Sequence, residues 1–194
     1  MLGLNYYTDG SIYIDVAGAD SPWAKLIRDI YDGRIISYSI DIKPSKRFSK
    51  YDFYVKMDAT KTNFNNNSID GVSLQCAFEM FIGNDDIALI KELKRILKPL
   101  GKAVILPLYM HTHSCHYASP DFYGKGLGDK DSIEYIRWDC YGIPSSRKYS
   151  AQKLKARILD LITDLGLKYK IYVLRNKEEI SEEIYLHFIL EIEK

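Results

Sequence analysis

Hydrophobic and polar positions along residues 68–108 follow two different periods. Residues 72–76 form a short apolar run, which is typical of a strand buried on both faces of a sheet. Apolar side chains between residues 87 and 97 then recur at helical spacing, with charged side chains on the opposite face. Residues 103–108 form a second apolar run. A strand, a helix and a second strand in this order predict a βαβ unit with parallel strands.

The residues that flank this predicted helix agree with its boundaries. Asn84 is a good N-cap residue, and the carboxylates of Asp85 and Asp86 suit the positive end of the helix dipole. Pro99 ends the helix, because the residue before a proline avoids the helical conformation. Gly101 then completes a tight turn into the second strand.

The N-terminal part of the chain repeats this pattern. It predicts a strand, a helix and two further strands over residues 12–16, 23–30, 34–41 and 51–57. Gly33 ends the helix. The small residues Ala17, Gly18 and Ala19 form the turn between the first strand and the helix. Such a turn lets the backbone approach a ligand, and the helix that follows presents free N–H groups to it.

The C-terminal part predicts one helix and two strands. The helix covers residues 150–165, with Ser150 as a cap and Gly166 at its end. Residues 167–174 and 184–192 have the composition of strands. Because these strands are close in sequence, we predict that they pair in an antiparallel hairpin at the end of the sheet.

Residues 109–149 have no clear period. They follow a strand of the predicted sheet and therefore leave it at the carboxyl end, where open α/β sheets bind ligands. We interpret them as a lid over the substrate, with a short helix over residues 132–139. The G-K-G-L-G run at 124–128 lacks the strand and helix that flank a phosphate-binding loop, and is expected to be a flexible part of the lid.

Composition narrows the class of protein. The chain has 194 residues, 46% of them hydrophobic and 27% charged, which is typical of one globular domain. A net charge of +1 gives no electrostatic basis for binding nucleic acid or an anionic membrane. The three cysteines form no paired framework, and no run is long and apolar enough to span a bilayer. These features predict a cytoplasmic protein.

The segment from Asp70 to residue 108 resembles the second half of a class I S-adenosylmethionine-dependent methyltransferase. Within that class it is similar to the methyltransferase type 11 family. That family has an Asp before the fourth strand, a Gln or His near the end of that strand, and a helix that ends in L-K-P-G-G. The corresponding residues are Asp70, Gln75 and the L-K-P-L-G of residues 97–101, with Leu100 where the family usually has Gly. The resemblance implies a Rossmann-like, doubly wound α/β fold with seven strands, mostly parallel, and a C-terminal antiparallel hairpin. Residues 1–194 are then a single domain with the 109–149 insertion.

The resemblance also implies S-adenosylmethionine as the cofactor. Asp15 matches the family's acidic residue near the end of the first strand, and Ala17-Gly18-Ala19 falls where the family has Gly-x-Gly. Alanine permits a close approach of the ligand but not a positive φ at low cost. Asp41 matches the carboxylate that accepts the ribose hydroxyl groups.

Three more cofactor contacts follow from the resemblance. Asp58 and Ala59 match the pair that reads the edge of the adenine base, although an Asp after a strand is equally an ordinary turn residue. Gln75 matches the residue at the end of the fourth strand. We expect Asp70 to fix the loop before that strand rather than to contact a ligand.

The candidate catalytic groups are Glu79, near the cofactor end of the site, and two histidines after the fifth strand. Glu79 falls where the family often has an acidic residue or a histidine that faces the active site, although it could equally be a solvated carboxylate at a helix start. His111 or His113 could serve as the base for a hydroxyl acceptor. With Cys115 and His116 they are also weak candidates for metal ligands, although no metal is predicted, and they could instead be loop residues with no special role.

The leading hypothesis is a methyltransferase that acts on a small molecule, such as a sugar or another compound with a hydroxyl group. The alternative is a catalytically inactive methyltransferase-like domain that serves as a binding or assembly module. A nicotinamide-dependent Rossmann enzyme is disfavoured by the closing hairpin and the absence of G-x-G-x-x-G. Since family members usually carry extra N-terminal helices, we expect a partner or a homo-oligomer to cover the open N-terminal side.

Overall fold

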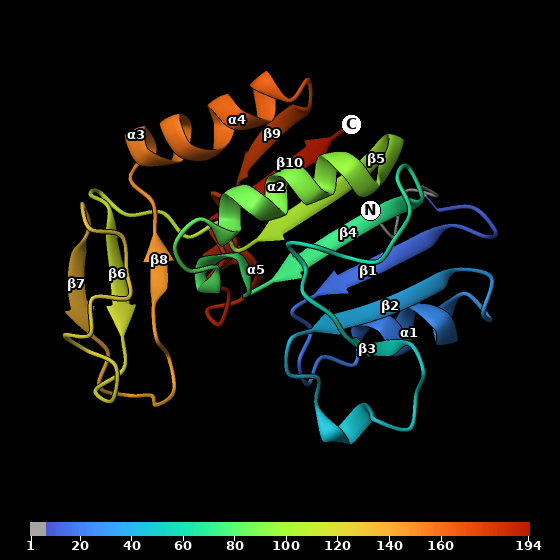
Figure 1. Ribbon diagram of the computed structural model, residues 1–194, viewed down its shortest axis with the longest axis horizontal. Helices are drawn as coiled ribbons and strands as arrows, with labels where there is room; N and C mark the ends of the chain where they lie inside the picture. The colour runs from blue at the N-terminus through green and yellow to red at the C-terminus, as the bar shows by residue number, and fades with distance from the viewer. Residues whose placement is uncertain (1–6) are drawn as a thin grey trace.

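The structure, a computed structural model, describes residues 7–194, so residues 1–6 of the predicted domain lie outside it. Its main feature is a seven-stranded sheet in the order β3-β2-β1-β4-β5-β10-β9 (Figure 1). The strands are β1 Ile12–Val16, β2 Ile36–Asp41, β3 Tyr54–Lys56, β4 Ile69–Gln75, β5 Leu97–Leu106, β9 Lys168–Val173 and β10 Phe188–Glu193. Only β10 runs antiparallel to its neighbours, β5 and β9. The predicted fold class, with its antiparallel C-terminal hairpin, is confirmed.

Helices lie on both faces of this sheet. Helix α1 (Trp23–Ile30) connects β1 to β2 and lies on the opposite face from α2 (Asp85–Ile96), which connects β4 to β5 (Figure 1). The predicted C-terminal helix is built of α3 (Ala151–Leu154), a π-helical turn (Lys155–Leu159) and α4 (Asp160–Asp164). The Ser150 hydroxyl accepts the Lys153 N–H, so the predicted cap is present. Short helical turns lie at Lys46–Phe48, Phe78–Met80 and Lys177–Ile180.

The main hydrophobic core lies between the sheet and the face that carries α2, α3 and α4. Alternate side chains of the strands point into it, because successive residues of a strand face opposite sides. The strands contribute Ile14, Val16, Val72, Leu74, Ala103, Ile105, Leu190 and Ile192, and α2 contributes Leu89, Ile90, Leu93 and Ile96. The apolar stripe predicted for α2 therefore faces this core.

Residues 109–149, here called the lid, contain a second sheet in the order β7-β6-β8. Its strands are β6 Cys115–Ala118, β7 Ile133–Ile136 and β8 Ser146–Lys148. The predicted short helix over residues 132–139 is therefore wrong, because Ile133 and Tyr135 favour a strand and β6 supplies the partner for pairing. This small sheet stands beyond the carboxyl ends of β1, β4 and β5 (Figure 1).

Other boundaries also differ from the sequence expectation. The third strand is shorter than residues 51–57, and the last strand begins at Phe188 rather than at 184. The fourth strand begins at Ile69, before the apolar run. There the Asp70 carboxylate accepts the Ile12 N–H and pairs with Lys98, so Asp70 fixes this end of the sheet.

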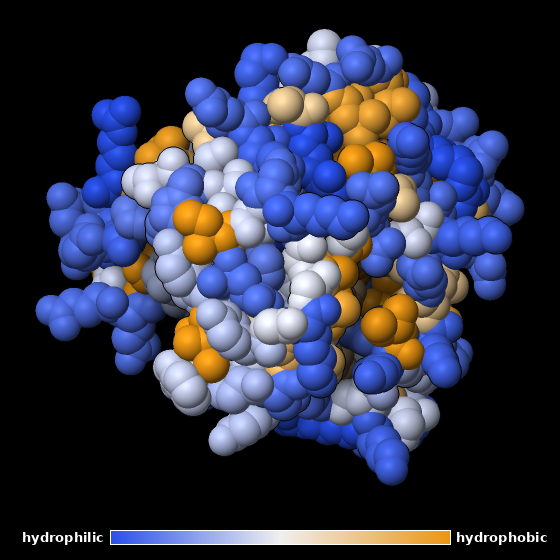
Figure 2. Space-filling view, turned by 60° about the vertical axis from the view of Figure 1, so that its left-hand side comes forward, coloured by the Kyte–Doolittle hydropathy of each residue, from blue (hydrophilic) through white to orange (hydrophobic). Residues whose placement is uncertain are grey.

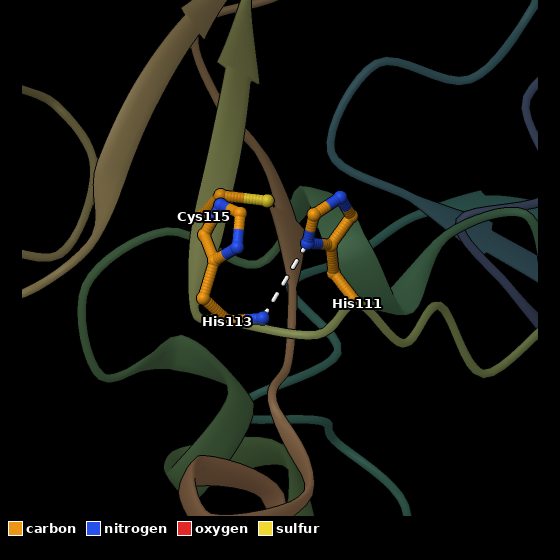
Figure 3. A group of neighbouring side chains, drawn as sticks. All are labelled: His111, His113 and Cys115. Carbon is orange, nitrogen blue, oxygen red and sulfur yellow. Dashed lines mark hydrogen bonds between the residues drawn. The ribbon is translucent and has the colours of Figure 1, made fainter.

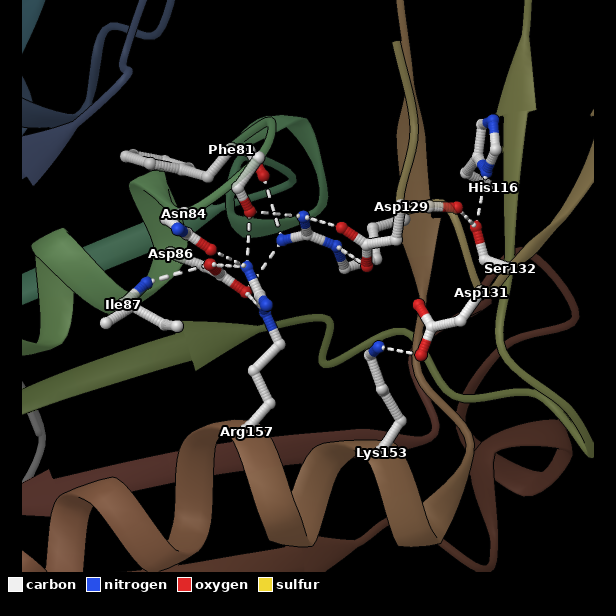
Figure 4. A network of polar contacts seen from close by, with 12 residues as sticks. Phe81, Asn84, Asp86, Ile87, His116, Asp129, Asp131, Ser132, Lys153 and Arg157 are labelled. Carbon is white, nitrogen blue, oxygen red and sulfur yellow. Dashed lines mark hydrogen bonds and ion pairs between the residues drawn. The ribbon is translucent and has the colours of Figure 1, made fainter. Parts of the chain in front are cut away.

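A buried ion-pair network attaches the lid to the main domain (Figure 4). Arg147 of β8 lies 2.7 Å from Asp86 of α2 and 2.9 Å from Asp129 of the lid. Arg157, in the π-helical turn, also contacts Asp86, at 2.7 Å. Arg147 further donates hydrogen bonds to the carbonyl groups of Phe81 and Gly83. The network therefore fixes the position of the lid relative to the carboxyl ends of the strands.

Among the helices of residues 7–194, none has the length and apolar character needed to cross a lipid bilayer.

Candidate active site

The turn after β1 has the backbone conformation that glycine favours. Ala17 has a φ of 54° and Ala19 a φ of 36°, both in the left-handed region. This conformation costs a residue with a Cβ atom ~1 kcal/mol or more. Gly18 is needed for a different reason, since a Cβ atom there would lie 2.3 Å from the Ser39 hydroxyl oxygen and 2.7 Å from a carboxylate oxygen of Asp15. The backbone of the turn therefore packs directly against Asp15, although two of its residues are alanines with positive φ.

Asp15 is a buried carboxylate directly beneath that turn. Its Oδ1 accepts hydrogen bonds from Ser73 and, at 3.4 Å, from Gln75, whereas its Oδ2 has no hydrogen-bond partner within residues 7–194. Burial raises the pKa of Asp15 above its usual value, and the hydrogen bonds oppose that rise. A buried, incompletely paired carboxylate favours a cationic group above the turn.

Four of the residues predicted to bind the cofactor line one cavity of about 260 Å³. They are Ala17, Asp41, Asp58 and Ala59. The Asp41 carboxylate accepts the Ala19 N–H at 3.1 Å and the Lys43 N–H at 2.7 Å, and each of its oxygens has a second lone pair for a ligand hydroxyl group. The cavity lies at the carboxyl ends of β1 and β2, where open α/β sheets bind ligands.

The loop that carries Asp58 and Ala59 is held by two sets of hydrogen bonds. Asp58 Oδ1 accepts both the N–H and the hydroxyl of Thr60, which is the ordinary turn role considered for this residue. Thr62 donates its N–H and its hydroxyl to Glu92 Oε1 of α2, at 2.7 and 2.6 Å. Helix α2 therefore fixes this loop.

Gln75 lines a second cavity, of about 290 Å³, together with Tyr13, Trp23 and Ser73. Tyr13, Ser73 and Gln75 share one face of the sheet, because β1 and β4 pair in parallel with Tyr13 opposite Gly71. The structure therefore places Gln75 near Asp15 but not in the cavity that contains Asp41 and Asp58.

Glu79 lies in the Phe78–Met80 turn, just beyond the end of β4. Its side chain is buried, and its Oε2 has no hydrogen-bond partner among the described residues. Burial raises the pKa of Glu79, while the positive charge of Lys148 in the lid lowers it. Lys148 lies over the Tyr109 ring, 3.4 Å from its centroid. A buried carboxylate between the sheet and the lid is thus available for proton transfer, and Glu79 is not the solvated carboxylate of the alternative interpretation.

Lys148 also lines a recess of about 460 Å³ on the lid, here called the lid recess. The other lining residues are Tyr117, Ile136, Arg137, Trp138, Asp139 and Ser146. Cationic and aromatic side chains therefore face this space. Figure 2 shows the side of the molecule that carries the lid as largely hydrophilic, with apolar residues in separate patches.

The predicted histidines separate into two groups. His111 and His113 lie at the base of the lid with their ring centroids 4.3 Å apart, and Cys115 lies beside them (Figure 3). His116 points to the other face of β6, where its Nδ1 hydrogen-bonds the Ser132 hydroxyl. A Cβ atom at Gly128 would meet the His116 ring, so the last glycine of the G-K-G-L-G run is needed for packing. A role of His111 or His113 as a base stays a prediction.

Several residues at the site were not predicted from sequence. Met57, Met80 and Phe81 contribute apolar walls to the 260 Å³ cavity. Their position directly after strands or in the turn beyond β4 is a signal that could have identified them, because ligands bind at the carboxyl edge. Lys148 and Arg147 carry no such signal, since only the folded lid brings them to the main domain.

An open sheet in the order β3-β2-β1-β4-β5-β10-β9, in which β10 is antiparallel to both of its neighbours, is the sheet of the class I methyltransferase type of fold. Residues 18–105 match the family described as Methyltransferase domain. The resemblance to S-adenosylmethionine-dependent methyltransferases, made from the sequence, is thereby confirmed. No curated protein matches the chain.

Solved structures agree on the fold. An S-adenosylmethionine-dependent methyltransferase from Mesorhizobium loti has a TM-score of 0.61 and 14% identity, over 96% of this chain and 92% of that one. The 1,6-didemethyltoxoflavin-N1-methyltransferase of Burkholderia thailandensis, with S-adenosylhomocysteine bound, has a TM-score of 0.58 and 11% identity, over 96% and 72%. A Haloferax volcanii methyltransferase in complex with an activator protein has a TM-score of 0.57 and 15% identity, over 95% and 82%.

Proposed function

We propose that this protein binds S-adenosylmethionine and transfers its methyl group to a small molecule with a hydroxyl group, such as a sugar. The observation that carries the proposal is the meeting of Ala17, Asp41, Asp58 and Ala59 around one cavity beside the buried carboxylate of Asp15. Relatives in fold include a methyltransferase with bound S-adenosylhomocysteine, which supports the same cofactor here.

The residues of the cavity have complementary roles in this proposal. Asp41 accepts the ribose hydroxyl groups, and the Asp58 carboxylate with the Ala59 N–H binds the adenine edge. The negative charge of Asp15 favours the cationic methionine end of the cofactor above Gly18. Methyl transfer is a displacement at a sulfonium, so the protein mainly aligns the two reactants and excludes water.

The acceptor occupies the space between the strand ends and the lid in this proposal. The lid recess offers aromatic faces and hydrogen-bond donors, which suit a polar small molecule. Glu79 is the group we assign to proton removal from the acceptor, because it is buried at the edge of the main domain with an unpaired oxygen. The three cysteines are unpaired, which supports a place in the reducing cytoplasm.

A partner or a second copy of the chain could complete the site on its N-terminal side. The sheet face that carries Tyr13, Ser73 and Gln75 borders the 290 Å³ cavity, and one relative in fold was solved in complex with an activator protein. Size-exclusion chromatography with light scattering, with and without cofactor, measures whether the chain self-associates.

Isothermal titration calorimetry with S-adenosylmethionine and S-adenosylhomocysteine tests the proposed function. The expected result is one site per chain with micromolar affinity for both ligands, and an Asp41→Ala variant that binds at least ~10-fold more weakly. The matched control is Asp52→Ala, at an exposed carboxylate outside the cavity. Absence of binding at millimolar ligand would instead support the non-catalytic module, for which the strained alanine turn is the specific observation.

A further inference from the structure

The base of the lid carries a group of metal-ligating side chains that methyl transfer does not require. His111, His113 and Cys115 each offer one ligand atom, and these three atoms lie within 4.8 Å of one another. Figure 3 shows the Cys115 sulfur pointing toward the His111 ring, with the His113 ring beside it. All three residues belong to the segment that leads from β5 into β6.

The local backbone produces this arrangement. The chain bends at Thr112 and His113, and the His113 N–H donates to His111 Nδ1 at 3.4 Å, so the two rings turn to the same side. Cys115 begins β6 and points to the opposite face from His116, because neighbouring residues of a strand alternate. Of the four residues considered from the sequence, Cys115 therefore joins the two histidines, whereas His116 points away from them.

Further contacts hold the group in place. His113 Nε2 is 2.9 Å from the Tyr135 hydroxyl of β7, and the Thr112 hydroxyl lies 3.2 Å from Nδ1 of the same ring, at the nitrogen that a metal ion would take instead. A hydrogen bond such as that with Tyr135, which fixes the orientation of a ligating imidazole, is usual at metal sites. The His111 N–H donates to the Tyr149 carbonyl at 2.8 Å, so the backbone of this residue is fixed as well. Cys115 is fully buried, while His111 and His113 are partly exposed.

We propose that His111, His113 and Cys115 bind a zinc-type divalent cation at the base of the lid. Two imidazole nitrogens and one thiolate are a ligand set that zinc and cobalt(II) accept in tetrahedral geometry. No fourth His, Cys, Asp or Glu joins the group within residues 7–194, so one coordination position is open to water or to a ligand. The ion links the segment after β5 to the lid sheet and stabilises that attachment.

Cobalt(II) titration of the purified full-length protein tests the proposal without any methyl acceptor. One equivalent of Co²⁺ is expected to produce visible d–d bands of a tetrahedral site and a near-ultraviolet band from sulfur-to-cobalt charge transfer. Zn²⁺ is expected to displace the Co²⁺ and to raise the melting temperature. Cys115→Ser should abolish the charge-transfer band and weaken binding at least ~10-fold, because the thiolate ligand is lost.

Two further variants keep the test decisive if Cys115→Ser folds poorly. Tyr135→Phe should lower the affinity for Co²⁺ by ~10-fold, because it removes the partner that orients His113. Cys140→Ser, which changes another thiol of the same lid, is the matched control and should bind like the wild type.

The proposal is overturned if the wild type shows no charge-transfer band with excess Co²⁺, or if Cys140→Ser loses the band while Tyr135→Phe keeps full affinity. Loss of methyl transfer in His111→Ala, with no metal bound by the wild type, would instead assign that histidine to the acceptor.

Discussion

Two alanines in the turn after β1 hold a backbone conformation that normally selects glycine. Ala17 and Ala19 both have positive φ, and they lie between a buried carboxylate and a cavity lined by cofactor-type residues. The two alanines therefore place backbone strain in this turn. This strain should lower the stability of the folded protein.

Ala17→Gly and Ala19→Gly should each stabilise the protein by up to ~1 kcal/mol, because glycine adopts positive φ without the Cβ clash. Chemical denaturation measures this change. The control is Ala88→Gly in the interior of α2, which should destabilise by about 1 kcal/mol. Destabilisation of all three variants to the same extent would mean that the turn is not strained.

Asp15 should lower the stability of the free protein while it favours the cofactor. Burial raises the pKa of Asp15 in the folded protein. The protonated side chain therefore stabilises the fold below its unfolded pKa of about 3.9, and this stabilisation is lost as pH rises through the folded pKa. Asp15→Asn should thus unfold at equal or higher denaturant concentration at pH 7, with the advantage shrinking at low pH. S-adenosylmethionine should bind this variant ~10-fold more weakly in calorimetry. Tighter binding to Asp15→Asn would contradict this electrostatic role.

Glu79→Gln should lower kcat by ~10²-fold and leave the affinity for S-adenosylmethionine unchanged, since the carboxylate is assigned to the acceptor. In the wild type, activity should fall as pH decreases through the raised pKa of Glu79, because the base must be deprotonated. Rate measurements across pH should show that this acidic limb is missing in the variant. Glu182→Gln, at an exposed glutamate, serves as the control. Equal loss of cofactor affinity and kcat would place Glu79 at the cofactor instead.

At the scale of elements, helix α2 supports the loop that borders the candidate cofactor cavity. Its Glu92 receives the two hydrogen bonds from Thr62 and a further pair from Arg95, at 2.6 and 2.9 Å. Arg95 also donates to the Phe64 carbonyl at 2.7 Å. One face of the helix thus packs in the core while its edge orders the loop that carries Asp58 and Ala59.

Glu92→Gln should destabilise the protein by ~1–3 kcal/mol, because the amide cannot accept all these donors. Burial opposes ionisation of Glu92, but hydrogen bonds from Arg95 and Thr62 lower its pKa. The carboxylate therefore stabilises the fold above its unfolded pKa of about 4.3, and this contribution is lost as pH falls through the folded value. Denaturation at pH 4 and pH 7 should show a smaller difference between wild type and variant at pH 4. A difference that grows toward pH 4 would contradict the assignment.

At the scale of the whole molecule, the lid is joined to the main domain by a buried charge network as well as by apolar packing, since Tyr149 belongs to the main hydrophobic core. Asp86 is fully buried and receives hydrogen bonds from Arg147, Arg157 and Tyr149. Arg157 reaches it from the π-helical turn, a local departure from regular helix that often occurs at functional sites.

Asp86→Asn should destabilise the protein by about 3 kcal/mol, because the partly buried Arg157 loses its counter-charge and the buried Arg147 keeps only that of Asp129. Hydrogen–deuterium exchange should rise in β6 and β8 more than in β1 and β4, since the network fixes the lid. Asp85→Asn, at the exposed neighbour in the same helical turn, is the control. Unchanged exchange in the lid of Asp86→Asn would show that other contacts hold it.

The sequence by itself determined the main sheet and the edge at which the candidate cofactor residues lie. Periods of two and of 3.6 residues, and turn residues such as Gly33 and Gly101, are local signals, and the order of the elements then limits the topology. The boundaries of single strands depend on pairing as well. Strand β4 begins at Ile69 because Ile69 pairs with Leu97 of β5, and not because of its own hydrophobic pattern.

Only the tertiary structure decided the lid and what it brings to the site. Strand β7 forms because β6 offers a partner for pairing, and a short polar-aromatic segment such as residues 133–136 does not encode that choice locally. The contacts of Arg147 with Asp86, and of Cys115 with the two histidines, depend on which face of a strand each side chain occupies. That face is fixed by register and by packing between distant segments, which a pattern of neighbouring residues does not contain.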